Sequence, residues 1–250
     1  PAVTDILVAL DVADRLVGRS DFCSAPMLAD IPTAGTGIQP NFEALVGLRP
    51  DLILAASTAA LEVETLGKIA PVEPLRWSSI EDPLTSIARL GELTASEDEA
   101  AALIKRFKSG FTGAVDADGP RILMVMDFGA QNEGQLWFIK PNSLHGQAII
   151  AAGGRHAVEG PVSGSPTLSL EALIELDPDI IISMVARDDL SDGERATRRA
   201  SMLAIKPLTA AKNGQVYILD GKWVFGEGPS LLRLVERLSE VIAVAEGIGD

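Results

Sequence analysis

The sequence has few of the residues that support redox, metal or covalent chemistry. Its 250 residues include one cysteine, Cys23, and two histidines, His145 and His156. One thiol cannot form an internal disulfide, and no Cys/His cluster offers a structural zinc site. Motifs of the types G-x-S-x-G, Walker A, H-E-x-x-H and C-x-x-C are also absent. The sequence therefore gives no support for an enzyme, and cysteine usage leaves the compartment open.

Long apolar runs and an excess of positive charge are missing too. No run approaches the roughly 18–20 apolar residues that span a bilayer. The 35 acidic residues outnumber the 21 basic ones and give a net charge of −14, which argues against a nucleic-acid partner. Because the chain opens at Pro1 without a signal peptide, we interpret it as a mature or trimmed sequence whose targeting segment is not included.

One stretch of the sequence occurs twice. Residues 41–57 read NFEALVGLRPDLILAAS, and residues 169–185 read SLEALIELDPDIIISMV. The offset is 128 positions, so that Glu43 corresponds to Glu171, and 7 of the first 14 positions are identical. A long period with only two copies indicates two similar lobes rather than a solenoid.

Each copy predicts a helix, a tight turn and a buried strand. Asn41 and Ser169 are residue types that cap a helix N-terminus. Pro50 and Pro178 push the preceding residue out of the helical region and so end the helix. The apolar runs that follow suit strands that are covered on both faces.

The rest of the chain alternates helical and strand patterns. This alternation predicts an α/β fold: two similar lobes with parallel sheets flanked by helices, joined by a long interdomain helix. We expect an N-terminal lobe at 1–95, a connecting helix at 96–116 and a C-terminal lobe at 117–250. The expected helices are 3–10, 58–69, 81–93, 96–115, 144–152 and 229–245, and the expected strands are a short one within 14–21, then 72–75, 121–127 and 216–219.

Four segments together resemble a known family. They are PAVTDILVAL, AGTGIQPNFEALVGLRPDLILA, HGQAIIAAGGRHAV and GQVYILDGKWVFGEGPSLLRLVERLSEVI, in this order. The sequence resembles the periplasmic substrate-binding proteins of ABC importers for ferric siderophores, haem and cobalamin. The resemblance implies a ligand bound between the lobes, and it implies that Glu43 and Glu171 engage arginines of the membrane permease. The plainer interpretation is that both glutamates only favour a helix dipole.

The predicted ligand-binding residues follow strands or precede the repeat helices. Ligands of open α/β sheets bind at the carboxyl ends of strands, and a cation beside an aromatic suits an anionic, ring-bearing ligand. The tryptophans can instead cap the lobe cores, Trp137 can be a strand residue, and Cys23 can be a small buried hydrophobe. The predicted set is Phe22, Cys23, Gly37, Gln39, Arg76, Trp77, Phe128, Trp137, Arg187, Lys222 and Trp223.

The resemblance also orders the candidate ligands. Gly37 and Ser165 stand where cobalamin binders of the family carry aromatics, and the only tyrosine, Tyr217, lies inside a predicted strand rather than at a haem iron. A ferric siderophore brings its own iron ligands and is favoured, while haem ligation by His145 stays open. We expect no cofactor, no bare metal ion and no nucleic acid, and a monomer that meets permease subunits in the periplasm or from an extracytoplasmic membrane anchor. The alternatives are a cobalamin or haem binder of the same family, and a ligand-sensing receptor or an enzyme on the same two-lobed scaffold.

Overall fold

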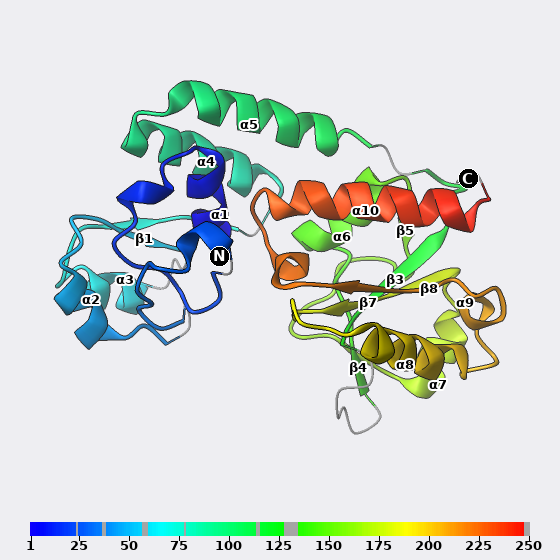
Figure 1. Cartoon of the computed structure of the whole chain (residues 1–250). Helices are drawn as coiled ribbons and strands as arrows, with labels where there is room; N and C mark the ends of the chain where they lie inside the picture. Colours follow the sequence, from blue (N-terminus) through cyan, green and yellow to red (C-terminus); the bar gives the residue numbers. More distant parts are fainter. Residues whose placement is uncertain are drawn as a thin grey trace. The chain divides into compact units, whose positions relative to one another are not determined.

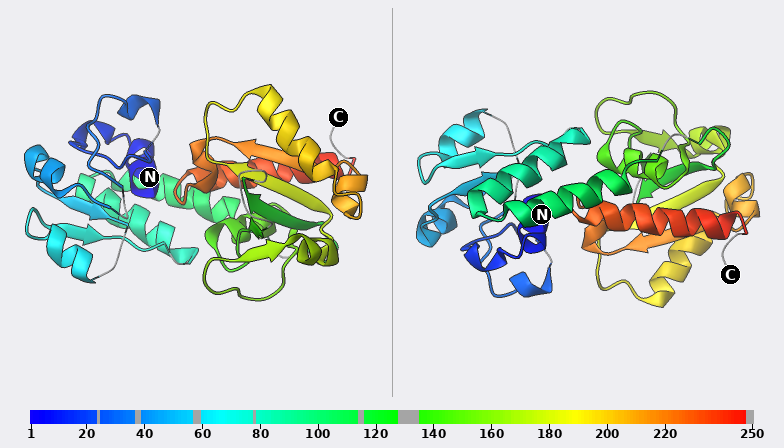
Figure 2. Two further views of the ribbon diagram at one scale, coloured as in Figure 1. Left: turned by 90° about the horizontal axis from the view of Figure 1, so that it is seen from below. Right: turned by 90° about the horizontal axis from the view of Figure 1, so that it is seen from above.

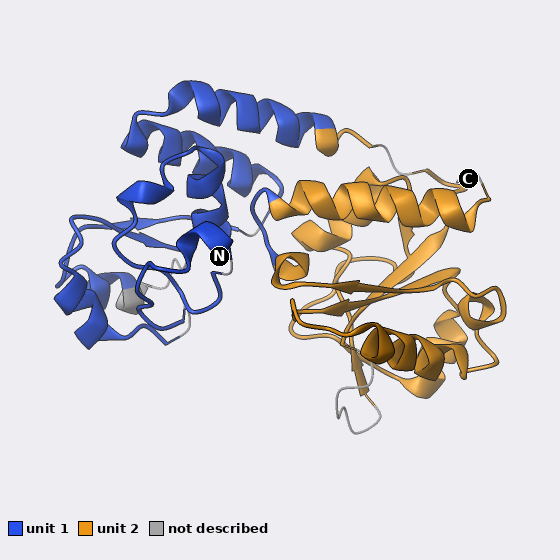
Figure 3. Ribbon diagram, viewed as in Figure 1, with its two compact units in different colours: residues 1–109, 226–229 blue, residues 110–225, 230–250 orange. Residues whose placement is uncertain are grey.

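The structure is a computed structural model that describes residues 1–23, 25–36, 39–56, 60–77, 79–113, 116–127 and 135–247. The chain divides into two compact units (Figure 3). Unit 1 comprises residues 1–109 and 226–229, and unit 2 comprises residues 110–225 and 230–250. The finer division into 1–95, 96–116 and 117–250 stays a prediction.

Unit 1 packs helices around a small parallel sheet. Strand β1 (Ile53–Ala55) pairs in parallel with β2 (Val72–Pro74). Its core includes Ile6, Leu28 and Leu90, which are fully buried. The helices are α1 (Ala2–Ala9), α2 (Phe42–Leu48), α3 (Ala60–Leu66), α4 (Glu81–Thr94) and α5 (Glu97–Gly110, whose last residue belongs to unit 2), with short 3-10 turns η1 (Ala13–Arg15) and η2 (Pro26–Leu28).

The strand expected within residues 14–21 is wrong. This segment forms only an isolated parallel bridge between Arg19 and Thr33. The Arg19 guanidinium donates hydrogen bonds to the carbonyls of Cys23, Leu28 and Ile31. The arginine thus gathers the loop around its own side chain, and backbone pairing does not extend beyond the bridge.

Unit 2 contains a four-stranded parallel sheet with helices on both faces (Figures 1 and 2). The strand order is β5 (Arg155–His156), β3 (Arg121–Met126), β7 (Ile180–Val185) and β8 (Val216–Asp220). All six residues of β7 are buried, as its continuous apolar run predicted. Helices α6 (Leu144–Ala151) and α10 (Ser230–Ala245) cover one face, and α7 (Leu170–Leu176), α8 (Asp192–Leu203) and α9 (Thr209–Lys212) cover the other. The remaining elements are the antiparallel pair β4 (Gln135–Trp137) and β6 (Thr167–Ser169), and the 3-10 turn η3 (Lys222–Phe225).

The α/β fold with parallel sheets flanked by helices is confirmed, and so are the cap, helix and strand of each repeat, although β1 is only partly buried. Asn41 Oδ1 accepts a hydrogen bond from Ala44 N at 3.0 Å, and Ser169 Oγ accepts one from Ala172 N at 3.2 Å. Helix α2 ends at Leu48 and helix α7 at Leu176. The next residue, Arg49 or Asp177, has a left-handed backbone conformation and directly precedes a proline. The repeated sequence therefore builds the same cap, helix and strand in both units.

The sequence analysis missed several elements. The short β4, β5, β6 and α9 leave too little pattern to detect. Helix α8 is different, because Ser191 and Glu194 form a capping box whose S-x-x-E signature is visible in the sequence. The expected helix at 96–115 is shorter in the structure and ends at Gly110, and residues 114–115 lie outside the described part of the chain.

Candidate functional site

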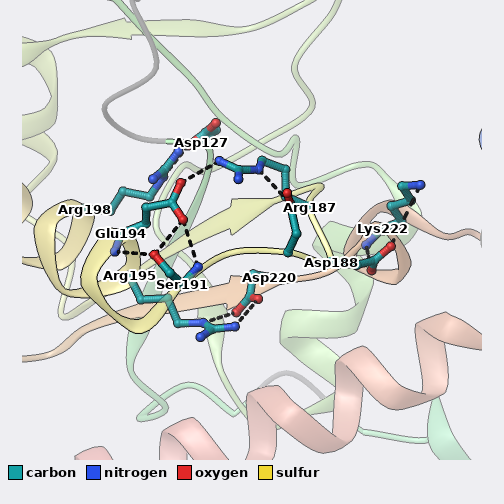
Figure 4. A network of polar contacts seen from close by, with 10 residues as sticks. Asp127, Arg187, Asp188, Ser191, Glu194, Arg195, Arg198, Asp220 and Lys222 are labelled. Atoms are coloured by element: carbon teal, nitrogen blue, oxygen red, sulfur yellow. Dashed lines mark hydrogen bonds and ion pairs between the residues drawn. The ribbon is translucent and has the colours of Figure 1, made fainter.

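The carboxyl ends of three strands in unit 2 converge on one edge of the sheet. Because β3, β7 and β8 are parallel neighbours, their ends lie at the same edge. Asp127 follows β3, Arg187 lies two residues after β7, and Asp220 is the last residue of β8. Ten described residues at this edge form six ion pairs, which we call the strand-end network. Its members are Asp127, Arg187, Asp188, Asp189, Asp192, Glu194, Arg195, Arg198, Asp220 and Lys222. Figure 4 labels most of them, together with Ser191.

Arg187, a predicted ligand-binding cation, is held by two carboxylates. Its Nε donates to Asp189 Oδ1 at 3.0 Å, and its Nη1 donates to Glu194 Oε1 at 2.8 Å. Glu194 also accepts at Oε2 from the backbone N–H and the hydroxyl of Ser191, at 2.9 and 2.7 Å. These hydrogen bonds, the Ser191 backbone bond first, lower the pKa of Glu194 to about 2. Arg187 and Glu194 are therefore both charged and mutually engaged at neutral pH.

Helix α8 supplies two more arginines to the strand ends. Arg195 makes a bidentate pair with Asp220, at 2.9 and 2.7 Å, and this pair lowers the pKa of the Asp220 carboxyl. Arg198 Nε donates to Asp127 Oδ1 at 2.9 Å. Each arginine thus ties α8 to the end of a different strand.

Lys222 and Trp223 lie on η3 directly after β8. The Lys222 backbone N–H donates to Asp188 Oδ1 at 2.9 Å, and its ammonium lies 4.0 Å from Asp188 Oδ2. Trp223 Nε1 donates to the Asp220 carbonyl at 3.0 Å, and the Arg233 guanidinium lies 4.1 Å from the ring centroid. These contacts fix the ring orientation.

Gly221 makes the position of Trp223 possible. Its φ is 115°, and a Cβ there would lie 2.5 Å from Trp223 Cδ1. Any side chain at this residue would both strain the backbone and displace the indole. The Asp-Gly-Lys-Trp sequence therefore positions the tryptophan through its glycine.

The predicted residues of unit 1 lie in three loops. Arg76 and Trp77 follow β2; Arg76 is exposed, and Trp77 is partly buried, with its Nε1 buried and without a hydrogen-bond partner among the described residues. Gln39 is exposed, and its backbone N–H donates to Thr36 Oγ1 at 2.9 Å. Phe22 and Cys23 are neighbours on the third loop, where Phe22 is exposed and Cys23 is buried, with its sulfur 3.1 Å from Thr4 Oγ1. This burial matches the reading of Cys23 as a small core residue.

The other predicted positions are Trp137, Gly37 and Phe128. Trp137 is a residue of β4, and 41% of it is exposed. Gly37 and Phe128 lie outside the described residues. In unit 2 the structure brings Arg187 and Lys222 into one network, and Trp223 bonds to its member Asp220. Glu194, Arg195, Arg198 and Asp220 were not among the predicted site residues, although Glu194 belongs to the capping-box signature that begins α8.

Both histidines are internal residues. His145, in the first turn of α6, is 7% exposed, and burial lowers its pKa to about 4. Its ring lies 6.3 Å from that of Phe225 on η3. The ring nitrogens of His156 lie 2.8 Å from the Ile139 carbonyl and 3.0 Å from the Val158 carbonyl. Within the described ranges, no group of three or more His, Cys, Asp or Glu side chains is placed to hold a metal ion.

Glu43 and Glu171 occupy equivalent positions on the two repeat helices. Each is exposed in the first turn of its helix. The pKa of Glu171 is lowered by its own backbone N–H and then by the Ser169 hydroxyl. Phe42 and Leu170, which directly precede the glutamates, are also exposed. Each unit therefore presents a carboxylate beside an apolar side chain.

A comparison with protein families decides the membership of the chain. A family model described as periplasmic binding protein matches residues 1–222. The chain belongs to the periplasmic binding protein family. This membership confirms the predicted family, which consists of substrate-binding transport proteins. No helix among the described residues combines the length and apolar character needed to cross a membrane.

Relatives of this periplasmic binding protein differ in the ligands that their names give. A protein of Halobacterium salinarum named "Cobalamin-binding protein" is 28% identical over 253 residues, covering 96% of this chain and 66% of the relative. The "Fe(3+)-citrate-binding protein YfmC" of Bacillus subtilis is 27% identical over 216 residues, covering 84% of this chain and 64% of the relative. The chain thus spans slightly less than two thirds of the length of these relatives.

A solved structure shares the fold over nearly the whole chain. It is titled "Periplasmic heme-binding protein BhuT in complex with two hemes" and superposes with a TM-score of 0.78 at 26% identity. The match covers 98% of this periplasmic binding protein and 96% of the other chain. The two-lobed α/β architecture is therefore that of solved binding proteins.

Proposed function

We propose that the protein is the substrate-binding component of an ABC importer and that it captures a ferric siderophore. The observation that carries this proposal is the family match over residues 1–222. The relative named for ferric citrate supports an iron complex as ligand. The protein itself performs no reaction; it binds the complex and presents it to the permease.

The proposed ligand contacts are the aromatic and polar side chains at strand ends. In unit 2 Trp223 offers a flat surface that the Asp220 carbonyl and Arg233 hold in place. In unit 1 Phe22, Arg76 and Gln39 are exposed. A hexadentate siderophore already satisfies its iron, so the protein needs to supply only such apolar and polar contacts.

The proposed partners are the membrane subunits of an ABC permease, which Glu43 and Glu171 contact. Both carboxylates are exposed, and Glu171 has a lowered pKa, so it is ionised at neutral pH and available to a cation. Such docking places the protein in the periplasm or, with an anchor, on the outer face of the membrane. We propose that it works as a monomer.

A corrinoid ligand is the second candidate. The Halobacterium salinarum relative, which matches 96% of the chain, is named for cobalamin. Ser165, at the place of a clamping aromatic in the resemblance, lies in the loop before β6. The small residue leaves the corrin without one of its stacking partners, which is why we rank the siderophore first.

A tryptophan-fluorescence titration tests the proposal. Ferrioxamine B, haemin and cyanocobalamin are each added to the purified protein and to Trp223→Phe and Trp137→Phe variants. We expect saturable quenching by ferrioxamine B at micromolar concentrations or below, and a smaller amplitude with Trp223→Phe because the quenched ring is lost. Saturation by cyanocobalamin alone would establish the corrinoid alternative. If none of the three saturates, the proposed ligand class is wrong.

A further inference from the structure

The three arginines of the strand-end network are already paired with carboxylates. Arg187, Arg195 and Arg198 each donate to carboxylates at 3.0 Å or less. Lys222 is weakly paired, with its ammonium 4.0 Å from Asp188. To contact one of these arginines, an anionic ligand would have to displace a carboxylate, and charge-assisted hydrogen bonds of this kind are among the stronger polar contacts in proteins.

The network as a whole carries negative charge. Its six carboxylates outnumber its four cations, which leaves a net charge of −2 at neutral pH. The lowered pKa values of Asp189, Glu194 and Asp220 keep these three acids ionised.

The three most exposed side chains of the network are carboxylates. The side chains of Asp188, Asp189 and Asp192 are 56%, 78% and 102% exposed, whereas those of Arg198, Arg195 and Arg187 are 18%, 37% and 41% exposed. The charges most accessible at this edge are therefore carboxylates, and the most accessible cation is Lys222, which is 49% exposed. Figure 4 shows the arginines from α8 directed toward the strand ends.

From these observations we infer that the protein selects iron complexes with no net negative charge. The inference rests on the proposed siderophore function and names the ligand class: a neutral or cationic ferric trihydroxamate rather than an anionic tricatecholate or citrate complex. Three hydroxamates balance the charge of Fe³⁺, whereas three catecholates leave a charge of −3. This inference differs from the anionic ligand that the Arg76–Trp77 and Lys222–Trp223 pairs suggested in the sequence.

The test uses three chelates on one scaffold that differ only in charge. Ferrioxamine B has a free ammonium and a charge of +1, its N-acetyl derivative is neutral, and its N-succinyl derivative carries −1. Dissociation constants are measured by tryptophan fluorescence at low ionic strength and again at 0.5 M salt. We expect the +1 chelate to bind about tenfold more tightly than the −1 chelate at low salt, and the difference to shrink at high salt.

A charge variant locates the source of the preference. Asp188→Asn combined with Asp189→Asn removes two exposed acids of the network and keeps their shape. The control, Glu236→Gln combined with Glu246→Gln, changes the net charge equally through two exposed residues in and just after α10. We expect the ratio between the +1 and −1 chelates to fall to about threefold or less in the first variant and to persist in the control.

Each outcome has one meaning. Binding of the −1 chelate as tightly as the +1 chelate overturns the inference and leaves the siderophore function intact. An equal loss of preference in both variants also overturns it, because the preference would then come from the total charge of the molecule. If none of the three chelates binds, the inferred trihydroxamate class is refuted.

Discussion

Arg49 and Asp177 end the two repeat helices with the same backbone conformation but with different side-chain contacts. Their φ angles are 48° and 41°, in the left-handed region. Arg49 is exposed, whereas the Asp177 carboxylate accepts hydrogen bonds from the Thr209 backbone N–H at 2.6 Å and hydroxyl at 2.8 Å. These bonds, the backbone one first, lower the pKa of Asp177 and connect the end of α7 to the start of α9. The residue at this position thus ends the repeat helix in both units. In unit 2 its side chain also connects two helices.

Glycine substitution separates the two roles. A non-glycine residue in the left-handed conformation costs about 1–2 kcal/mol, and substitution by glycine removes this cost. The greater freedom of glycine in the unfolded chain cancels about 0.4–1 kcal/mol of the gain. We expect Arg49→Gly to leave the free energy of unfolding unchanged or to raise it by about 0.5 kcal/mol. Asp177→Gly relieves the same strain but loses bonds to a charged acceptor, so we expect a loss of about 1–3 kcal/mol. Urea unfolding measures both, and shifts of equal size and sign would contradict this account.

At the scale of elements, α8 holds the strand-end network together. Glu194, Arg195 and Arg198 lie within one turn of one another, which places them on neighbouring positions of the helix surface. From there they reach Arg187, Asp220 and Asp127, which follow or end three different strands. The helix is therefore fixed to the sheet by charge as well as by its buried Met202.

The same element shows where sequence reasoning stops. Periodicity and caps predicted the repeat helices, the buried strands and α10, because each of those signals is local. The pairing of Arg198 with Asp127 spans 71 positions and depends on the register of β3 against β7. No local pattern contains that register. Arg187 was predicted as a ligand-binding residue, and its two carboxylate partners, on the loop after β7 and on α8, were not predicted. The strand ends predicted which segments gather at this edge, and the ion pairs among them required the structure.

Removing the cap of α8 tests how much the helix depends on it. Ser191→Ala removes the oxygen that accepts from the Glu194 backbone N–H and the hydroxyl that donates to Glu194 Oε2. We expect the free energy of unfolding to fall by about 1 kcal/mol. Ser201→Ala is the matched control, because that hydroxyl donates only to the Thr197 carbonyl within the same helix. Chemical denaturation of both variants should show a loss for the first and little change for the second; equal losses would mean that the capping box does not stabilise α8.

At the scale of the whole molecule, the repeat supplies each unit with the same exposed carboxylate. The offset of 128 residues carries Glu43 to Glu171, each in the first turn of a helix that begins with a side-chain cap. The surrounding positions differ more, since α7 buries Leu173 whereas α2 has no fully buried residue. What the two copies share most closely is thus the cap, the carboxylate and the apolar residue before it. A permease with two equivalent subunits would need such a handle on each unit.

Single and double substitutions of the two glutamates test this arrangement. Removing one partner of an interfacial charge pair costs roughly 2–5 kcal/mol of binding free energy. We therefore expect Glu43→Gln and Glu171→Gln each to slow uptake of a radiolabelled ferric chelate in vesicles that contain the permease, and the double variant to abolish it. The affinity for the chelate in solution should not change in any of the three. Glu175→Gln, which removes an exposed glutamate from the last turn of α7, controls for the charge lost and should transport normally. Weakened chelate binding by the double variant would instead place the glutamates in the ligand site. If the double variant supported uptake as fast as the unmodified protein does, the glutamates would not be part of the docking surface.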